Sequence, residues 1–369
     1  MRLTTLAAAL TLTTALGASL GTALLPGTAA AQAPAAAPQG TPQGPVTLLT
    51  YSGIFRDNYL DTVVNPFAQR TGIAVQYGDA GLGGSAQFLG TLRAQKADPQ
   101  VDVVIMDATT AAAACAEGLV EKLTPEDVPE LAQLDEQARS SGAGCGPAVT
   151  YDHLSLVYDT EKVKPAPTRW ADFAKPEFAG KLSFSTLPNI QALALIGALA
   201  NHATGDWRKI DSAIPTLKAI APNVQTFEPS PDGGAMVLSG QVEMGTLWNA
   251  RAQYYHDQSK GRLGVIIPEE GTAFQINTIN IVANAPHRAA AIAFVRNALS
   301  AGPQVAFTDR MFYGPTNVEA QRTAKAIDRT ALDPKYRSRV APIDWLEAVR
   351  LRDRWNQVWR REVMTAANR

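Results

Sequence analysis

Residues 101–106 read VDVVIM, a nearly continuous run of β-branched and other apolar side chains that is broken by one aspartate. Such a run is typical of a strand that is covered on both faces, as in a parallel sheet flanked by helices. The next stretch, residues 108–118, is predicted to form a helix that ends at Gly118. This strand followed by a helix indicates an α/β fold.

The segments before residue 101 show the same alternation of strand and helix. Residues 46–51 (VTLLTY) form a short apolar run, and residues 58–70 carry apolar side chains at helical spacing. Gly72 stands where a helix C-cap belongs, and residues 73–77 (IAVQY) alternate as in a strand. A helix over residues 86–94 completes the first α/β unit.

A second α/β unit is predicted after an extended run at residues 148–158. Its strands are expected at 182–185, 244–248 and 264–267, and its helices at 190–201, 207–220 and 234–238. A return crossing is expected at 276–282, followed by helices at 288–299, 320–327 and 343–363. Trp345, Val349, Trp355 and Trp359 mark this last helix, and the spacing of the tryptophans is that of an amphipathic helix that packs on a domain.

The N-terminal residues 1–31 have the pattern of a secretory signal peptide, with Arg2 as the only charge and small residues before a predicted cleavage after Ala31. A retained membrane anchor is the alternative, disfavoured because glycines and Pro26 interrupt the apolar run. Residues 32–45 are uncharged and rich in proline, alanine and glycine, which predicts a disordered leader. We therefore expect export to the periplasm.

The composition limits the classes of function. The chain beyond the leader exceeds the size at which a single core stops growing, so about two domains are expected. The formal net charge is -1 and no basic run is present, which excludes a typical nucleic-acid binder. In an exported chain, Cys115 and Cys145 either form one disulfide or remain two separate thiols.

Several short motifs occur in a fixed order along the chain. They are residues 71–73 (TGI), 117–118 (EG), 168–180 (TRWADFAKPEFAG), 245–249 (GTLWN), 268–271 (PEEG), 284–286 (NAP) and 313–317 (YGPTN). In order and spacing this series resembles the periplasmic spermidine/putrescine-binding proteins and related extracellular solute-binding proteins, over nearly the whole mature chain.

The resemblance implies a two-lobed periplasmic binding protein fold of type II, with a ligand cleft between the lobes and hinge strands that cross between them. Lobe one is then expected over residues 46–150 plus 273–318, and lobe two over residues 151–272 plus 319–369. This arrangement agrees with the two α/β units and the return crossing predicted from the residues.

The function that the resemblance implies is that of a periplasmic receptor of an ABC importer. Such a receptor captures a small polar organic solute by hinge closure and delivers it to a permease in the inner membrane. We expect a monomer that needs no cofactor or metal and binds no nucleic acid. The alternatives are a true putrescine or spermidine receptor, a ferric-ion binder and a periplasmic sensor subunit. An exported enzyme is disfavoured, because no Gly-x-Ser-x-Gly, His-Glu-x-x-His or paired-carboxylate pattern stands out.

Candidate ligand-binding residues stand where strands are predicted to end, because ligands bind at the carboxyl ends of strands in such folds. The residues found in this way are Tyr51, Ser52, Gly53, Gly84, Ser85 and Asp107. The resemblance adds Thr186, Trp248, Asn249, Arg251, Gln275, Asn277 and Tyr313. An ordinary helix cap at Ser85, a core role for Trp248 and a surface position for Arg251 are the open alternatives.

Two positions depart from the polyamine-binding pattern. After the PEEG turn, this chain has Gln275 and Asn277 at the two positions where the polyamine receptors that it resembles carry a tryptophan and an aspartate. Residues 186–190 (TLPNI) also offer no carboxylate. A desolvated ammonium group without a carboxylate is costly, and Asp107 can satisfy only one such group. We therefore expect a neutral, zwitterionic or anionic solute instead of a polyamine.

The tyrosine pair of a ferric-ion site is also displaced. Tyr254, Tyr255 and His256 lie several residues beyond the family position of that pair, which falls at Ala250 and Arg251. The four histidines show no metal-ligand spacing. A solvated helix face is therefore the favoured interpretation of residues 254–256.

Overall fold

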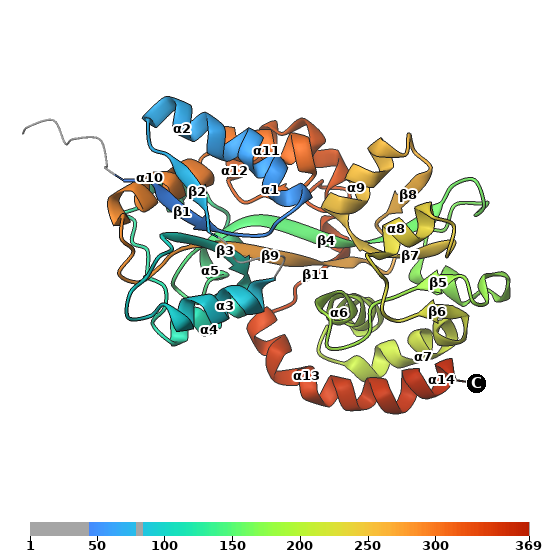
Figure 1. Cartoon of the computed structure of the whole chain (residues 1–369). Helices are drawn as coiled ribbons and strands as arrows, with labels where there is room; N and C mark the ends of the chain where they lie inside the picture. Colours follow the sequence, from blue (N-terminus) through green and yellow to red (C-terminus); the bar gives the residue numbers. More distant parts are fainter. Residues whose placement is uncertain (1–43, 79–83, 369) are drawn as a thin grey trace, which may run out of the picture. The chain divides into compact units, whose positions relative to one another are not determined.

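A computed structural model describes residues 44–78 and 84–368, so the predicted signal peptide and residues 32–43 of the predicted leader lie outside the described part. Its strands are β1 (Val46–Leu49), β2 (Val75–Tyr77), β3 (Val103–Asp107), β4 (Ala148–Asp159), β5 (Leu182–Ser183), β6 (Val224–Thr226), β7 (Met244–Trp248), β8 (Leu263–Ile266), β9 (Thr272–Ile281), β10 (Gly314–Pro315) and β11 (Val340–Ala341). They pair in the order β2-β1-β3-β9-β4-β7-β5-β6, with β8 and β10 on β4 and β11 on β9 (Figure 1).

The VDVVIM stretch forms β3, which begins at Val103, and its side chains from Val103 to Met106 are completely buried. The prediction of a strand covered on both faces is confirmed. β3 runs parallel to β1 but antiparallel to β9, so the sheet is mixed. The parallel pairs β1–β2 and β5–β7 belong to the two α/β units, and the antiparallel strands join these units.

The two longest strands, β4 and β9, pair with each other in antiparallel fashion and run through the middle of the sheet (Figure 1). β9 also pairs with β3 of the first α/β unit, whereas β4 also pairs with β7 of the second unit. β4 and β9 are therefore the hinge strands of a two-lobed fold. β9 begins at Thr272, four residues before the predicted return crossing at residues 276–282.

The α-helices are α1 (Ile54–Tyr59), α2 (Asn65–Thr71), α3 (Ser85–Ala94), α4 (Ala108–Ala116), α5 (Glu136–Ser140), α6 (Ile190–Thr204), α7 (Ile210–Ile220), α8 (Gly233–Leu238), α9 (Asn249–Gln258), α10 (Arg288–Leu299), α11 (Ala301–Met311), α12 (Val318–Thr323), α13 (Trp345–Trp359) and α14 (Thr365–Ala367). Wider π-helical turns span Leu60–Val64 and Arg360–Met364. Short 3₁₀ helices span Pro129–Gln133, Trp170–Ala174, Pro176–Phe178, Ala221–Asn223, Lys325–Arg329 and Arg337–Arg339. Helix α4 follows β3 directly, as predicted.

The sequence prediction missed helix α11. Gly302 and Pro303 discourage a helix in a sequence pattern, but both lie in the first turn, where the missing N–H of proline costs nothing. Phe307 and Met311 are buried on the inner side of α11 and stabilise it by tertiary packing. The helix is therefore decided by what it packs against.

The tryptophans of α13 are buried, which confirms their predicted role in the core, whereas Val349 of the same helix is exposed. Trp345, Trp355 and Trp359 are exposed by 5%, 1% and 2% respectively. The Trp345 Nε1–H also donates a hydrogen bond of 2.7 Å to the carbonyl oxygen of Phe274 in β9. Helix α13 is thereby attached to a hinge strand.

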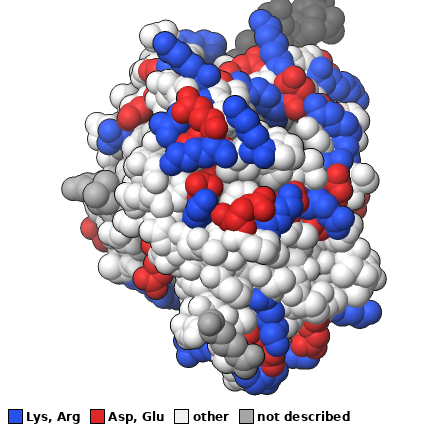
Figure 2. Space-filling model, turned by 90° about the vertical axis from the view of Figure 1, so that its right-hand side faces the viewer, with Lys and Arg blue, Asp and Glu red and all other residues white. Residues whose placement is uncertain are grey.

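Cys115 at the end of α4 and Cys145 before β4 are joined by a disulfide bond of 1.99 Å. Cys145 is buried beside Val120 and Leu119 in a core cluster that packs under β3. None of the helices in residues 44–78 and 84–368 has the length and apolarity that crossing a membrane requires. On the face shown in Figure 2, basic and acidic side chains are intermingled and do not form a patch of one sign.

Candidate ligand-binding site

One face of the hinge strands carries four polar side chains. The register pairs Asp152 with Gln275 and Thr150 with Asn277, and paired residues in an antiparallel ladder point to the same face. The Asn277 Nδ2–H donates a hydrogen bond of 3.0 Å to Thr150 Oγ1, which directly joins β9 to β4. Two of these residues, Gln275 and Asn277, were predicted from the sequence.

Tyr51, Ser85 and Asn277 form a hydrogen-bond network on this face. The Tyr51 hydroxyl donates to Asn277 Oδ1 at 3.0 Å and lies 2.9 Å from Ser85 Oγ. Because the single hydroxyl hydrogen of Tyr51 goes to Asn277, the Ser85 hydroxyl is the donor to the Tyr51 oxygen. Ser85 Oγ in turn accepts the backbone N–H of Asp107 at 3.0 Å. The ends of β1 and β3, the start of α3 and the middle of β9 are therefore brought together.

The Tyr51 hydroxyl stays protonated in this environment. Burial raises the pKa of Tyr51 far above its ordinary value, and the charge of Asp107 raises it further. Tyr51 is therefore a fixed hydrogen-bond donor at neutral pH.

Asp107 uses its carboxylate inside the protein. Oδ1 accepts the N–H of Thr110 at 2.9 Å and the hydroxyl of Thr109, and Oδ2 accepts the Thr110 hydroxyl at 2.8 Å. These bonds cap the N-terminus of α4, which is the ordinary role of an aspartate at this position. The carboxylate is therefore already engaged before any ligand arrives.

Ser52, Gly53 and Gly84 lie at helix starts. Gly53 is the N-cap of α1 and has φ 65°, a backbone conformation that glycine adopts without strain. Gly84 is the exposed N-cap of α3, and Ser52 is half-buried between β1 and α1. These positions agree with the predicted turns after β1 and before α3.

Trp248 and Asn249 follow one another at the junction of β7 and α9. Trp248 is half-buried and is the N-cap of α9. Asn249 is completely buried, and its Nδ2 donates to the carbonyl oxygens of Phe312 at 3.2 Å and Arg329 at 3.0 Å. The Asn249 amide therefore attaches α9 to the segment around residues 312–329.

Arg251 lies in the first turn of α9 and pairs with Asp232. Arg251 Nη1 is 3.1 Å from Asp232 Oδ2, and the exposed fractions of the two side chains are 49% and 9%. Asp232 Oδ2 also accepts the Tyr255 hydroxyl at 3.1 Å, and Oδ1 accepts the Ala235 N–H at 2.9 Å to cap α8. Burial lowers the pKa of Arg251, but the charge and hydrogen bond of Asp232 more than offset this effect and raise it.

Tyr313 joins the two groups of candidate residues. Its ring lies edge-on to Phe55 with centroids 5.5 Å apart, and Phe55 lies edge-on to Tyr51 at 5.4 Å. Burial raises the pKa of Tyr313, the charge of Asp152 raises it further, and the charge of Arg251 lowers it. Tyr313 is thus near both charged residues and linked to Tyr51 by an aromatic contact.

Asp152 is a buried acid in the hinge that the sequence prediction missed. Its Oδ1 accepts the N–H of His153 at 2.8 Å and of Ala250 at 3.1 Å. Burial raises the pKa of Asp152 to about 7, while these backbone hydrogen bonds and Arg251 act in the opposite direction. The only sequence signal was one acid within the otherwise mainly apolar run at residues 148–158.

Asp232 and Tyr255 were also missed as members of the site. Asp232 stands directly before Gly233, the first residue of α8, and this N-cap pattern could have located it at the end of the sheet. Thr186 lies beyond β5, and its N–H donates to the carbonyl of Phe227 at 2.9 Å. No hydrogen bond within the described residues joins the side chain of Thr186 or Gln275 to the other predicted residues.

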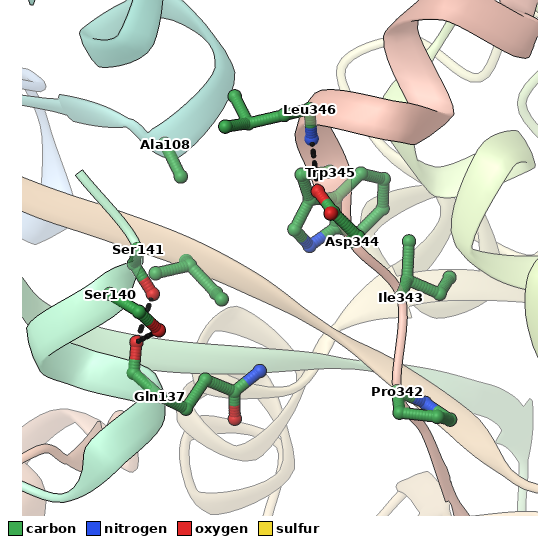
Figure 3. A pocket seen from close by; sticks show the side chains of 10 residues that line it. Ala108, Gln137, Ser140, Ser141, Pro342, Ile343, Asp344, Trp345 and Leu346 are labelled. Carbon is green, nitrogen blue, oxygen red and sulfur yellow. Dashed lines mark hydrogen bonds between the residues drawn. The ribbon is translucent and has the colours of Figure 1, made fainter. Parts of the chain in front are cut away.

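The opposite face of the hinge strands borders two cavities. Tyr151 of β4 stacks on Phe274 of β9 on this face, with ring centroids 5.1 Å apart. Both rings border a cavity of about 560 Å³. A second cavity of about 340 Å³ lies beside Ile276, where Figure 3 shows Ser140 of α5 and Asp344 on either side. None of the predicted site residues lines either cavity.

Two of the side chains in residues 254–256 are engaged within the protein. The Tyr255 hydroxyl is bound to Asp232, and His256 Nδ1 lies 2.8 Å from the carbonyl oxygen of Leu263. Within residues 44–78 and 84–368, no group of three or more histidine, cysteine, aspartate or glutamate side chains is arranged to hold a metal ion.

Comparison with known proteins shows similarity to solute-binding proteins. The spermidine/putrescine-binding periplasmic protein 1 of Haemophilus influenzae is 26% identical over 283 residues, which cover 75% of this chain and 76% of that protein. The gamma-aminobutyric acid-binding protein of Pseudomonas aeruginosa is 26% identical over 228 residues, which cover 58% of this chain and 62% of that protein.

The fold is shared with solved structures of the same kind. An ABC transporter substrate-binding protein from Bradyrhizobium japonicum superimposes with a TM-score of 0.73 at 20% identity, covering 85% of this chain and 99% of that one. The model of the family described as bacterial extracellular solute-binding protein matches residues 62–334, most of the chain. This protein is a member of the bacterial extracellular solute-binding protein family.

Proposed function

We propose that this protein is the solute receptor of an ABC importer and holds a small polar organic solute between lobe one and lobe two. The lobes are those expected from the sequence, residues 46–150 plus 273–318 and residues 151–272 plus 319–369. The observation that carries the proposal is the convergence of predicted residues at the hinge strands, above all the Tyr51–Asn277 hydrogen bond. The end of β1 reaches the hinge strands through this bond, and the end of β7 reaches them through the Ala250 N–H, which donates to Asp152. Ligands bind at such strand ends in these folds.

The proposal includes the place and the partners of the protein. Residues 1–31 direct export, the mature chain begins near Gln32, and the receptor works in the periplasm beside a permease. Within the described residues, Val349 is the one large apolar side chain classed as exposed, which favours a monomer. Intermingled surface charge in Figure 2 is unlike a nucleic-acid-binding surface. The candidate residues are hydrogen-bond donors, acceptors and aromatic rings, which favours binding without catalysis.

Ligand capture is expected to make the protein more compact. Groups on both lobes must be satisfied by one solute, so closure of the hinge strands accompanies binding. Calorimetry first identifies a binding solute among putrescine, γ-aminobutyrate and glycerol 3-phosphate, and small-angle scattering then compares the free and saturated protein. A radius of gyration that stays constant at saturation would contradict the receptor mechanism.

The polyamine alternative is favoured by the named relatives but not by the hydrogen bonds of the site. At the position of the family acid, the Asn277 amide is held between Tyr51 and Thr150. Asp107 has its carboxylate in the cap of α4. The remaining acid on this face is Asp152, and burial raises its pKa to about 7, which disfavours the charged carboxylate. Because putrescine carries two ammonium groups, we expect it to bind weakly to the unmodified protein.

The double variant Asn277→Asp, Gln275→Trp is expected to strengthen putrescine binding by at least about tenfold. A carboxylate at position 277 has about four acceptor sites, and the hydroxyls of Tyr51 and Thr150, which already lie 3.0 Å away, would use two of them. The other two would remain for an ammonium group, whereas Asp107 already accepts three hydrogen bonds. The indole supplies a face for the methylene chain and the cation. The measurement is calorimetry with putrescine.

The two single variants serve as controls, because the carboxylate alone should produce most of the gain. Submicromolar binding of putrescine by the unmodified protein would show that the polyamine alternative is correct. An unchanged affinity in the double variant would show that the face of Asn277 does not contact the solute.

A further inference from the structure

The guanidinium of Arg251 is used less completely than that of Arg208. Arg208, for comparison, binds Glu347 through two bonds of 2.7 and 2.8 Å from Nε and Nη2. Within the described residues Arg251 makes one hydrogen bond, from Nη1 to Asp232, and its Nε and Nη2 have no protein acceptor. A guanidinium with such a free edge can still bind a planar or tetrahedral anion through two parallel bonds.

We propose that Arg251 binds an anionic group of the transported solute, a carboxylate or a phosphate monoester, and that Asp232 and Tyr255 are the residues that position it. This inference rests on the proposed function, because the anionic group belongs to the solute held at the hinge. It goes beyond that function by naming the class of solute.

The location of Arg251 supports this role. It lies three residues after Trp248, in the first turn of the helix that follows β7. The preceding residue, Ala250, donates its N–H to Asp152 Oδ1 in the hinge strand at 3.1 Å. The Arg251 charge acts on Asp152 and on Tyr313, which contacts Phe55. Arg251 is therefore a cation placed among the residues that the sequence predicted for the site.

Asp232 holds the guanidinium without using all of its donors. Its Oδ2 is shared between Arg251 Nη1 and the Tyr255 hydroxyl, and its Oδ1 is occupied by the Ala235 N–H. The carboxylate is thus fixed from three directions, and its exposed fraction is only 9%. A fixed counterion on one edge orients the other edge, so the loss of side-chain entropy on binding an anion is smaller.

The groups around Arg251 favour binding of an anionic group over binding of an ammonium group. The carboxylate of Asp107 is engaged in capping α4, and the family acid is replaced by the neutral Asn277. Asp152 has one oxygen engaged by two backbone N–H groups, and burial, which raises its pKa to about 7, disfavours its charged form. Arg251 would repel an ammonium group brought close to it, whereas it would attract a carboxylate or phosphate.

The test compares matched probes by calorimetry on the full mature chain. Putrescine and γ-aminobutyrate share an amino group on a short methylene chain and differ at the other end, and glycerol 3-phosphate represents the phosphate monoesters. The unmodified protein is expected to bind γ-aminobutyrate or glycerol 3-phosphate more tightly than putrescine. Whichever anionic probe binds identifies the carboxylate or the phosphate as the recognised group.

Arg251→Gln is expected to weaken binding of that anionic probe by about 10-fold to 100-fold, as for the loss of hydrogen bonds to a charged group. Arg251→Lys retains the charge and the pair with Asp232 but loses the fork, so a smaller loss is expected. Arg322→Gln is the matched control, because this exposed arginine on α12 also has one carboxylate partner, Glu319. It should leave the affinity unchanged.

Asp232→Asn tests the positioning role. Asparagine caps a helix as well as aspartate, so α8 is retained while the counterion of Arg251 is lost. The expected result is weaker binding of the anionic probe with an unchanged melting temperature, whereas a structural defect would lower the melting temperature as well. Thermal melting of each variant checks folding, and Arg251→Lys keeps the test valid if Arg251→Gln is unstable.

Three outcomes would overturn the inference. Equal affinity of Arg251→Gln and the unmodified protein for the anionic probe would remove the role of Arg251. Binding of putrescine with neither anionic probe would also reject it while leaving the receptor function intact. If none of the probes binds, and none of them lowers the radius of gyration, the result would count against both the anion site and the receptor function.

Discussion

Replacing both Cys115 and Cys145 by serine is expected to lower the free energy of unfolding by about 3 to 4 kcal/mol. The disulfide joins residues with a sequence separation of 30, and closing a loop of that length restricts the unfolded chain. Cys145 is buried, so serine at this position also places a hydroxyl in an apolar cluster. Equilibrium unfolding in denaturant measures the change.

The unmodified protein under reducing conditions is the control, and it should lose most of the same stability. Mass spectrometry without reductant should show one bond between Cys115 and Cys145 in protein taken from the periplasm. Unfolded protein that has not been reduced is treated with an alkylating reagent. If both cysteines react, the disulfide does not form during export, and replacing the cysteines should then not cost the stability expected above.

Replacing Asp152 by asparagine is expected to stabilise the protein more at high pH than at low pH. Burial raises the pKa of Asp152 from 3.8 to about 7, so the folded protein binds this proton more tightly than the unfolded chain. The resulting stability is fully present below pH 3.8 and is lost as the pH rises through about 7. A shift of this size corresponds to at most about 4 kcal/mol. Asparagine keeps an oxygen that accepts the N–H groups of His153 and Ala250 but carries no charge to desolvate.

The measurement is the difference in unfolding free energy between the variant and the unmodified protein, at pH about 4 and about 8. His153 has the opposite dependence, because burial lowers its pKa to about 3 and its contribution is present above pH 6.5 and lost as the pH falls through about 3. This contribution occurs in both proteins and cancels in the difference. If the difference in unfolding free energy is the same at both pH values, the charged form of Asp152 does not destabilise the folded protein.

The alternation of strands and helices was readable from the sequence because burial on two faces leaves a local pattern. The run at residues 101–106 predicted the completely buried strand β3, and the spacing of Trp345, Trp355 and Trp359 predicted a packed helix. Helix α11 was not readable, since the glycine and proline of its first turn carry a local signal against a helix that packing overrides. Local patterns therefore predict an element when its burial is regular along the chain.

The candidate residues from Tyr51 to Asp107 were located by the same local signals, because strand ends and helix caps have recognisable residues. The candidates from Thr186 to Tyr313 came from the family resemblance. Asp152, Asp232 and Tyr255 were missed, since each is marked by a partner that is distant in the sequence or in another element. Asp152 binds the N–H of Ala250, 98 residues away, and Asp232 binds the guanidinium of Arg251 and the Tyr255 hydroxyl across the gap between α8 and α9.

The sequence by itself determined the α/β class, the order of the elements, the family resemblance and the strand ends at which polar residues gather. Only the tertiary structure decided which polar atoms are already engaged. Tyr51 meets Asn277 across 226 residues, and Asn249 is turned inward to two carbonyl groups, whereas the free edge of Arg251 has no acceptor among residues 44–78 and 84–368. The physical reason is that hydrogen-bond partners depend on strand register and helix placement, which arise only when distant parts of the chain pack together.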